Sequence, residues 1–499
     1  MIRAAGLLIT GILGLALLVW AVSVGFTRAS ERTVQYQYIA DALDNLTARP
    51  DRVTWGQALR PLDRAFTPAD AAQVGTAMTH AWASLTLAQA TGRPDILRDG
   101  FSGVALERAA SSVPDAQKGG GRMVVLSQEA RPQFYHLDGS VFQTDVTLLV
   151  ARFLVEGEDL VHAELVFDRA TTTLMNETNG WRIYTHERED VLPVDAPRSV
   201  WSGPPLAGLN YYPALTPWSA FWPGFDEAVV AKDFALASSL GTNAVRIFLT
   251  TAVFSDPQTQ PRALSDLARL LQLAEASGLQ VVPTLFDLKP GYDPSLWAQD
   301  AAFLTAVLPV LRASPAVAFI DLKNEPDLDY AVHGRGLVQA WLATMATLIR
   351  HQAAGLPLTI GWSSVTVARD MIGTVDLVTY HDYAPLEDAR ASLARLRDQT
   401  DLPVMITEIG QTSYSMLLGL PASEASQAQG LTDRMAALQS ADGVFVWTLH
   451  DFPKVEAGAV GASPWVQRVQ ERFGLFDTDG HEKPAAAAVR DGFARLTRD

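Results

Sequence analysis

The strongest constraint on the fold is a repeated alternation between short apolar runs and helical stretches in the C-terminal part of the chain. Runs of strand length lie at residues 207–211, 244–248, 281–285, 317–322, 358–361, 377–380, 404–406 and 444–448. Helical stretches separate them, for example at 226–239, 264–277, 337–354 and 424–440, and a last helix is expected at Pro484–Leu496. Because strands that alternate with helices pair in parallel, eight such units in about 300 residues predict a closed (β/α)8 barrel, the α/β fold known as the TIM barrel.

The region before the barrel has a different order of elements. Helical patterning at 36–43 and 68–89 is followed by extended runs at 133–137, 141–155, 161–167, 171–176 and 181–184, the last after the turn Asn179-Gly180. Helices followed by an antiparallel sheet predict a smaller α+β domain over residues 30–197. The proline-containing segment 191–197 is typical of a linker, so we expect the barrel domain at 198–499.

The N-terminal segment 1–29 is expected to be a membrane anchor. Residues 4–26 carry no charge and are flanked by Arg3, Arg28 and Arg32. A bilayer needs about 20 apolar residues to be crossed, whereas the apolar core of a cleaved signal peptide, the alternative, has about 7–15. We therefore predict a single transmembrane helix in the inner (cytoplasmic) membrane, with the other domains on the periplasmic, extracytoplasmic side.

Composition excludes several classes of partner and chemistry. The 39 Lys and Arg residues against 55 Asp and Glu give a formal net charge of −16, which argues against nucleic acid as a partner. The absence of cysteine excludes disulfides, thiolate metal sites and cysteine nucleophiles. No other group of residues has convincing metal-ligand spacing, so we expect neither a metal nor another cofactor.

Two carboxylates are expected at the mouth of the predicted barrel. The fourth apolar run leads into Asn324, Glu325 and Pro326, and the proline ends the strand. Glu408 follows the seventh run on the same face as its inward residues, because side chains alternate along a strand. Barrel enzymes keep their chemistry at this end of the strands. A carboxylate pair suits glycosidic bond cleavage, where one group protonates the leaving oxygen and the other attacks or stabilises the oxocarbenium-like carbon.

The sequence motifs at these strand ends, taken together, resemble those of clan A glycoside hydrolases, and among them the family-five group of cellulases and mannanases. The resemblance rests on Asn324-Glu325-Pro326, His381-Asp382-Tyr383, Thr407-Glu408-Ile409-Gly410 and Trp447, with Gly208-Leu209-Asn210-Tyr211-Tyr212-Pro213 at the start of the barrel and Phe473-Gly474-Leu475-Phe476-Asp477 and Lys483-Pro484 at its end. One departure is Phe286-Asp287, where the family usually has a histidine near the end of the third strand.

The resemblance implies a role for each of these residues. Glu325 would be the general acid/base, and Glu408 the nucleophile that forms a covalent glycosyl-enzyme. These roles require Glu408 to be ionised and Glu325 to be protonated, so we expect a raised pKa for Glu325. The resemblance also implies a substrate-binding set of Arg246, Asn324, His381, Tyr383 and Trp447. Aromatic rings can cover the apolar faces of sugars, so Tyr211 and Trp218 are added as stacking residues. Further stacking candidates are Tyr212, Trp222 and Trp362.

Within that set the implied contacts differ. Asn324 would bind the hydroxyl next to the reacting carbon, and Trp447 would form the floor beneath the sugar. Arg246 and Tyr383 would keep Glu408 ionised and oriented, because a nearby cation and a donated hydrogen bond both favour a charged carboxylate. His381 would contact the substrate or Glu325.

The N-terminal α+β domain resembles the nuclear-transport-factor-2/SnoaL type through its order of elements and the strand Gly180-Trp181-Arg182-Ile183. Such folds imply a pocket. The sequence offers no acid/base pair in this domain, and fold alone does not give function, so a spacer or dimerisation role is favoured.

The sequence thus predicts a retaining glycoside hydrolase or transglycosylase that acts on a β-linked glucan or a related polysaccharide, next to polysaccharide synthesis or export machinery. Hydrolysis and transglycosylation use the same residues and stay open. Two alternatives belong to other classes. One is a non-catalytic glycan-binding or scaffold component of an export system. The other is an aldolase-type barrel with Lys323 as the Schiff-base lysine.

Overall fold

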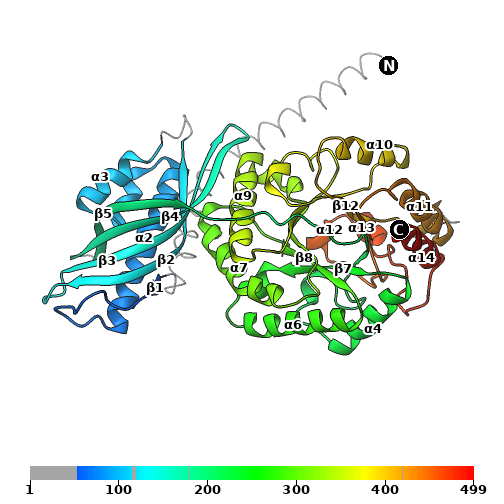
Figure 1. Cartoon of the computed structure of the whole chain (residues 1–499), viewed down its shortest axis with the longest axis horizontal. Helices are drawn as coiled ribbons and strands as arrows, with labels where there is room; N and C mark the ends of the chain where they lie inside the picture. The colour runs from blue at the N-terminus through cyan, green and yellow to red at the C-terminus, as the bar shows by residue number, and fades with distance from the viewer. Residues whose placement is uncertain (1–52, 115–119, 179, 418–419, 499) are drawn as a thin grey trace, which may run out of the picture. The chain divides into compact units, whose positions relative to one another are not determined.

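The computed structural model describes residues 53–114, 120–178, 180–417 and 420–498 (Figure 1). The predicted anchor at 4–26 and the helix at 36–43 lie outside these ranges. Within them, no helix is both long enough and apolar enough to cross a bilayer. The described residues divide into two compact units, each with most of its contacts inside itself. The first comprises residues 53–148 and Asp168–Val191, and the second comprises Leu149–Phe167 and residues 192–498.

The first unit contains most of a five-stranded sheet with the strand order β1-β2-β3-β4-β5, of which the segment Leu149–Phe167 in β3 and β4 belongs to the second unit. Its strands are β1 (Val53–Trp55), β2 (Arg122–Tyr135), β3 (Val141–Glu156), β4 (Asp159–Glu177) and β5 (Gly180–Pro193). Helices α2 (Pro68–Thr91) and α3 (Gly103–Ser111), joined by the 3-10 turn η2 (Pro94–Asp99), lie together on one side of it (Figure 1). The predicted α+β class is confirmed.

Three details of this sheet differ from the sequence prediction. The first is β1, which precedes the helices and pairs with β2 in parallel, whereas an antiparallel sheet after the helices was expected. The runs at 161–167 and 171–176 form the single strand β4, because Asp168 between them is buried and paired with Arg188 of β5 instead of turning to solvent. In addition, β5 continues to Pro193, so the segment expected to be a linker begins inside a strand.

All eight predicted barrel strands are present, and they close into a barrel in the order β6-β7-β8-β9-β10-β11-β12-β15. Their bounds are β6 Leu206–Asn210, β7 Ala244–Thr250, β8 Gln280–Asp287, β9 Ile320–Asn324, β10 Leu358–Trp362, β11 Val378–His381, β12 Val404–Ile409 and β15 Gly443–Val446. Neighbouring strands pair in parallel, with Gly208 opposite Ala244 and Val444 opposite Ala207 at the closing seam. The predicted (β/α)8 barrel is confirmed.

Helices surround the strands (Figure 1). The longer ones are α4 (Glu227–Ser239), α6 (Gln260–Ala276), α7 (Trp297–Arg312), α9 (Arg335–Gln352), α10 (Leu386–Arg397), α11 (Glu424–Ala437) and α14 (Pro484–Leu496). Shorter ones are α5 (Thr251–Ser255), α8 (Tyr330–His333), α12 (Ala457–Val460) and α13 (Pro464–Gln470), with 3-10 turns η3 (Trp218–Ala220), η4 (Pro294–Leu296), η5 (Pro326–Asp329) and η6 (Ile372–Thr374) and the small hairpin β13 (Ser415–Leu417) and β14 (Leu420–Pro421).

A layer of apolar side chains fills the barrel at the start of its strands. It consists of Leu206, Ala244, Val282, Ala318, Phe319, Leu377, Met405 and Phe445, all at most 5% exposed. The barrel is therefore a packed core at this end. Arg246, Asp321, Glu325 and Glu408 lie toward the other end, where the strands finish.

Candidate active site

Both predicted catalytic glutamates line one cavity of about 420 Å³ at the C-terminal ends of the barrel strands. Its wall is formed by Tyr212, Trp218, Phe248, Asp287, Leu288, Lys289, Lys323, Asn324, Glu325, Leu328, Asp329, Glu408, Trp447, Ala459, Val460 and Gln470. Aromatic rings and carboxylates therefore face the same space, as the sequence predicts for Trp218, Asn324 and Trp447.

Glu325 lies directly after the last residue of β9 and has a left-handed backbone, with φ 45° and ψ 51°. Its backbone N–H donates to the Gly361 carbonyl at 2.6 Å, which ties it to β10. Pro326 begins η5 and ends the strand as expected. The carboxylate is about a quarter exposed, and its Oε1 lies 2.7 Å from Nδ1 of the fully buried His381.

Glu408 lies near the end of β12, opposite His381 of β11 in the sheet register. Its Oε1 accepts a hydrogen bond of 2.7 Å from the Tyr383 hydroxyl. Its Oε2 lies 3.5 Å from Nη1 of Arg246 and 3.9 Å from Nδ1 of His381. His381 thus stands between the two glutamates, and the sum of its two distances, about 6.6 Å, is the upper limit of the gap between Glu325 Oε1 and Glu408 Oε2.

Arg246 on β7 is fully buried and holds the polar ends of several strands together. It donates to Asp321 Oδ2 on β9 at 3.0 and 2.7 Å, to Asn210 Oδ1 at 3.0 Å and to Asn324 Oδ1 at 2.8 Å. Because Arg246 already donates to the side-chain oxygen of Asn324, the side-chain NH2 of Asn324 is the group that remains for a ligand of the cavity. Arg246 is not part of the cavity wall, so it acts on a bound sugar only through Asn324 and Glu408.

Asp321 is a residue that the sequence interpretation missed. It is fully buried, and besides Arg246 it accepts the Thr284 hydroxyl at 2.9 Å and the Gly361 N–H at 2.8 Å. The signal was an acid inside the apolar run, two residues before Lys323 and therefore on the same inward face. A charged residue at such a position is retained only with a partner, and the inward-facing Arg246 was available.

The pKa directions of the two glutamates in the substrate-free protein are opposite to the expected ones. For Glu325, burial acts to raise the pKa, but the hydrogen bond and charge of His381 outweigh it and lower the pKa. For Glu408, burial raises the pKa, and the nearby Glu325 charge adds to this although His381 and Arg246 oppose it. The expectation of a raised pKa for Glu325 is therefore wrong for the empty site.

His381 has a pKa above the ordinary histidine value. Burial disfavours its protonation, but the Glu408 carboxylate and the bond to Glu325 outweigh it and raise the pKa of His381. Its Nε2 is buried with no hydrogen-bond partner among the described residues. The His381 nitrogen nearest to Glu325 is Nδ1, which lies 2.7 Å from the carboxylate oxygen.

The proposed stacking residues divide into two groups. Tyr212, Trp218 and Trp447 line the cavity, with rings 5.7 to 6.3 Å apart between centroids. Tyr211, in contrast, is fully buried outside the cavity wall, because β6 ends at Asn210 and the Tyr211 hydroxyl turns to donate to Asp233 at 3.0 Å. The prediction that Tyr211 contacts substrate is wrong. Trp222 and Trp362 are likewise buried outside the wall.

Two lysines and their acidic partners form one side of the cavity. Lys289 Nζ donates to both oxygens of Asp300 at 2.8 and 2.7 Å. Lys323 Nζ donates to the backbone carbonyl of Asn324 at 2.7 Å and lies 3.6 Å from the Asp329 carboxylate. Asp287 stands near the position where the resembling family usually has a histidine. It accepts a hydrogen bond of 2.9 Å from the Tyr212 hydroxyl, and burial raises the pKa of Asp287. Lys289, Asp300 and Asp329 were not recognised from the sequence, since single charged residues in loops give no signal.

Among the residues that the structure describes, one group could offer three ligand atoms to a metal: Asp477, Asp479 and His481 on an exposed turn. The Asp477 carboxylate already accepts the backbone N–H groups of Asp479 and His481 at 2.9 and 2.8 Å. This explains the cluster as a turn held by hydrogen bonds.

No model of a protein family matches the sequence, and neither does any of the curated proteins. Among solved structures, similar ones are GH5_18 from Streptomyces cattleya in complex with GlcNAc (20% identity, TM-score 0.49, 60% of this chain and 81% of that chain) and the exo-beta-1,4-mannosidase Op5Man5 from Opitutaceae bacterium strain TAV5 (21%, 0.49, 61% and 62%). A third is a GH2 beta-galacturonidase from Eisenbergiella tayi bound to galacturonate (15%, 0.45, 74% and 72%).

These structures belong to glycoside hydrolases, the class that the sequence motifs resemble. The predicted resemblance of the N-terminal domain to the nuclear-transport-factor-2/SnoaL type stays a prediction.

Proposed function

We propose that the barrel is a retaining glycosidase that cleaves a β-linked glycan by double displacement, with Glu408 as nucleophile and Glu325 as acid/base. The observation that supports this most directly is the placement of both carboxylates on one cavity, bridged by His381. Their nearest oxygens are at most about 6.6 Å apart. Retaining enzymes have carboxyl groups about 5–5.5 Å apart, and inverting enzymes about 6.5–9.5 Å, so this upper limit includes the retaining separation and excludes most of the inverting range for this oxygen pair.

In the first step, Glu408 forms a bond to the anomeric carbon as the bond from that carbon to the leaving oxygen breaks, and Glu325 gives its proton to that oxygen. In the second step, an incoming hydroxyl attacks the same carbon, Glu325 takes its proton, and Glu408 leaves as a carboxylate. Arg246 and the Tyr383 hydroxyl stabilise the leaving carboxylate, because both interact more strongly with its charged form.

The proton for the first step is supplied through His381. In the empty site this proton lies on Nδ1, and Glu325 is ionised beside it. A sugar bound over Glu325 excludes water, which raises the free-energy cost of the carboxylate charge. The proton then moves along the 2.7 Å hydrogen bond to Glu325 Oε1, and the imidazole keeps the proton on Nε2. The acid is thus protonated only when substrate is present.

The proposal includes the class of substrate. We infer a β-glucan or a related β-linked polysaccharide, with water or a sugar hydroxyl as acceptor. The extracytoplasmic location next to polysaccharide export machinery depends on the apolar run 4–26 acting as an anchor.

The aldolase alternative is disfavoured by the surroundings of Lys323. A Schiff base needs a neutral amine. The Lys323 ammonium is instead stabilised by its hydrogen bond to the Asn324 carbonyl and by the Asp329 carboxylate. A glycan-binding protein without catalysis would need the stacking rings and Asn324, but it would not need two carboxylates around a shared histidine.

The experiment compares wild-type protein with Glu408→Gln, Glu325→Ala and, as a control, Glu387→Gln on an exposed position of α10. Substrates are the 4-nitrophenyl β-glucoside and β-mannoside, together with β-glucan and mannan polymers. We expect Glu408→Gln to lower kcat by about 1,000-fold or more, and Glu387→Gln to leave it unchanged. In Glu325→Ala, azide needs no general base, so it should restore turnover of the activated glycoside and give a glycosyl azide of retained β configuration.

Unchanged turnover in Glu408→Gln would refute the mechanism. An α-configured azide product would refute the retaining assignment. Saturable binding of the polymers by wild type, with neither cleavage nor transfer in any product analysis, would show a glycan-binding protein.

A further inference from the structure

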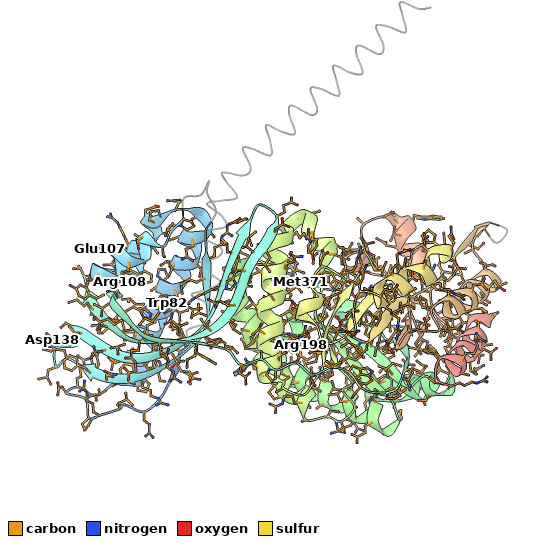
Figure 2. The ribbon with its side chains drawn as sticks, turned by 45° about the horizontal axis from the view of Figure 1, so that its top comes forward. Trp82, Glu107, Arg108, Asp138, Arg198 and Met371 are labelled. Atoms are coloured by element: carbon orange, nitrogen blue, oxygen red, sulfur yellow. The ribbon has the colours of Figure 1, made fainter. Side chains whose placement is uncertain are left out.

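The first unit encloses a second cavity, of about 310 Å³, between helices α2 and α3 and the sheet. Most of its wall is apolar, with Leu85 from α2, Ala109 from α3, Met123 from β2 and Leu148 from β3. Trp82 lies in this layer between helices and sheet (Figure 2). Sites for small molecules have volumes of about 300–1,000 Å³ and mainly apolar walls with a few polar groups, so this cavity is at the small end of that range.

One polar group in the wall lacks a partner. Trp82 is 7% exposed, and its Nε1–H makes no hydrogen bond among the described residues. The ring stands edge-on to Phe101 and to His186, at centroid distances of 5.7 and 4.9 Å, so it is fixed by packing. A buried N–H without an acceptor destabilises the folded protein, because it has lost its hydrogen bonds to water. An acceptor atom on a bound molecule would satisfy this donor.

The polar part of the wall has a surplus of positive charge. Asp168 on β4 is buried and pairs with Arg188 on β5 at 2.8 Å. Arg108 on α3 is a second cation, exposed at the surface, whose Nη1 donates to the His186 carbonyl at 3.3 Å and to no carboxylate among the described residues (Figure 2). Burial lowers the pKa of His186 to about 4, so this histidine is neutral at pH 7. Two guanidinium groups therefore face one carboxylate.

We propose that this cavity binds a small carboxylic acid whose apolar body, an aromatic ring or a short acyl chain, fills the space between Trp82 and Leu148 and whose carboxylate pairs with Arg108. The site is independent of the reaction in the barrel, and it gives the first unit a binding role beyond the spacer or dimerisation role expected from the sequence.

The test is isothermal titration calorimetry of the full chain with two probes, 4-phenylbutyrate and 4-phenylbutanamide, which share the apolar body and differ in charge. We expect one saturable site for the carboxylate, and about tenfold weaker binding of the amide, because a hydrogen bond to a charged group contributes about 1.5–3 kcal/mol. Arg108→Gln should remove this difference without weakening the amide. Glu107→Gln, the neighbouring charge on the same helix, should leave both affinities within about twofold.

A second pair of variants tests whether the probe occupies the cavity itself. Ala109→Leu adds bulk at the wall and should weaken both probes by about tenfold or more, while Ala110→Leu, the next residue on α3 and outside the wall, should not. If thermal unfolding shows that Ala109→Leu does not fold, Ala105→Leu on the same wall replaces it with the same expected result. Absence of saturable binding at millimolar probe, or equal losses in Ala109→Leu and Ala110→Leu, would overturn the proposal. Equal losses of both probes in Arg108→Gln would overturn the assigned carboxylate contact.

Discussion

Replacing Tyr383 by Phe removes a single hydrogen bond from the proposed nucleophile. The Tyr383 hydroxyl donates to Glu408 Oε1 at 2.7 Å. Although the residue is 45% exposed, desolvation of its hydroxyl and the charge of Glu408 raise the pKa of Tyr383 well above 10, so it remains a donor over the whole pH range of the enzyme. A hydrogen bond to a charged group contributes about 1.5–3 kcal/mol. At 1.36 kcal/mol per unit, its loss should raise the pKa of Glu408 by about one to two units.

The direction of the Glu408 pKa shift depends on which form of Glu408 the hydrogen bond stabilises. The hydroxyl stabilises the carboxylate, so its removal favours the protonated form, which cannot attack the sugar. The acidic limb of kcat/KM reports the free enzyme. In Tyr383→Phe this limb should therefore move to higher pH by about one to two units, and kcat/KM at pH values on the acidic side of the wild-type limb should fall by about ten- to a hundredfold.

Tyr380→Phe is the matched control. Tyr380 lies on β11, the strand that ends two residues before Tyr383, and its buried hydroxyl has no hydrogen-bond partner among the described residues. Its removal should leave the pH profile in place. The reasoning is refuted if the acidic limb of Tyr383→Phe stays at the wild-type pH, or if Tyr380→Phe shifts it by the same amount.

Two further predictions concern stability. Arg246→Met should cost the barrel about 3–5 kcal/mol, because it leaves Asp321 buried without its cation. Arg490→Met, at an exposed pair with Glu482, should cost less than about 1 kcal/mol, and similar urea midpoints for the two variants would contradict this. The pKa of His186 is about 4 in the folded protein against about 6.5 unfolded. Its contribution of about 3 kcal/mol is therefore present above pH 6.5 and is lost as the pH falls toward 4. His186→Asn should unfold with a weaker dependence on pH over this window, as followed by thermal melts, and an unchanged dependence would contradict the assignment.

The barrel was predictable because its strands are short, mostly apolar and separated by helices. The runs at 244–248 and 281–285 lie inside β7 and β8, whose residues are almost all buried. Errors occurred where one polar residue interrupts a strand and the partner that neutralises it is distant in sequence. Asp168 divided the expected strand in two, because its pairing with Arg188 becomes visible only when β4 and β5 lie side by side.

The site was predictable as a set of residue types at strand ends, but not in its geometry. Alternation along a strand gives the direction of a side chain only as far as the strand continues. Glu408 lies within β12 and faces the cavity as expected, whereas Tyr211 follows the last residue of β6 and turns away from it. The pKa directions depend on distances of 2.7 to 3.9 Å around His381, which spacing in the sequence does not contain.

Backbone conformation links the fold to the chemistry of the cavity. Four residues other than glycine have positive φ in the described ranges: Trp218 at 50°, Phe286 at 50°, Leu288 at 52° and Glu325 at 45°. Three of them line the cavity, and Phe286 directly precedes Asp287, which also lines it. A left-handed backbone costs a residue other than glycine roughly 1–2 kcal/mol, and such strain persists only where the surrounding structure holds it in place.

Glycine would adopt these conformations without strain, but it would remove the side chain. At Glu325 the strained residue is the proposed acid itself. Pro326 disfavours the helical region for the residue before it, and the Gly361 carbonyl fixes the Glu325 N–H. The backbone between these two restraints turns the carboxylate off the strand toward His381, so the strain at Glu325 places the acid where its proton is held.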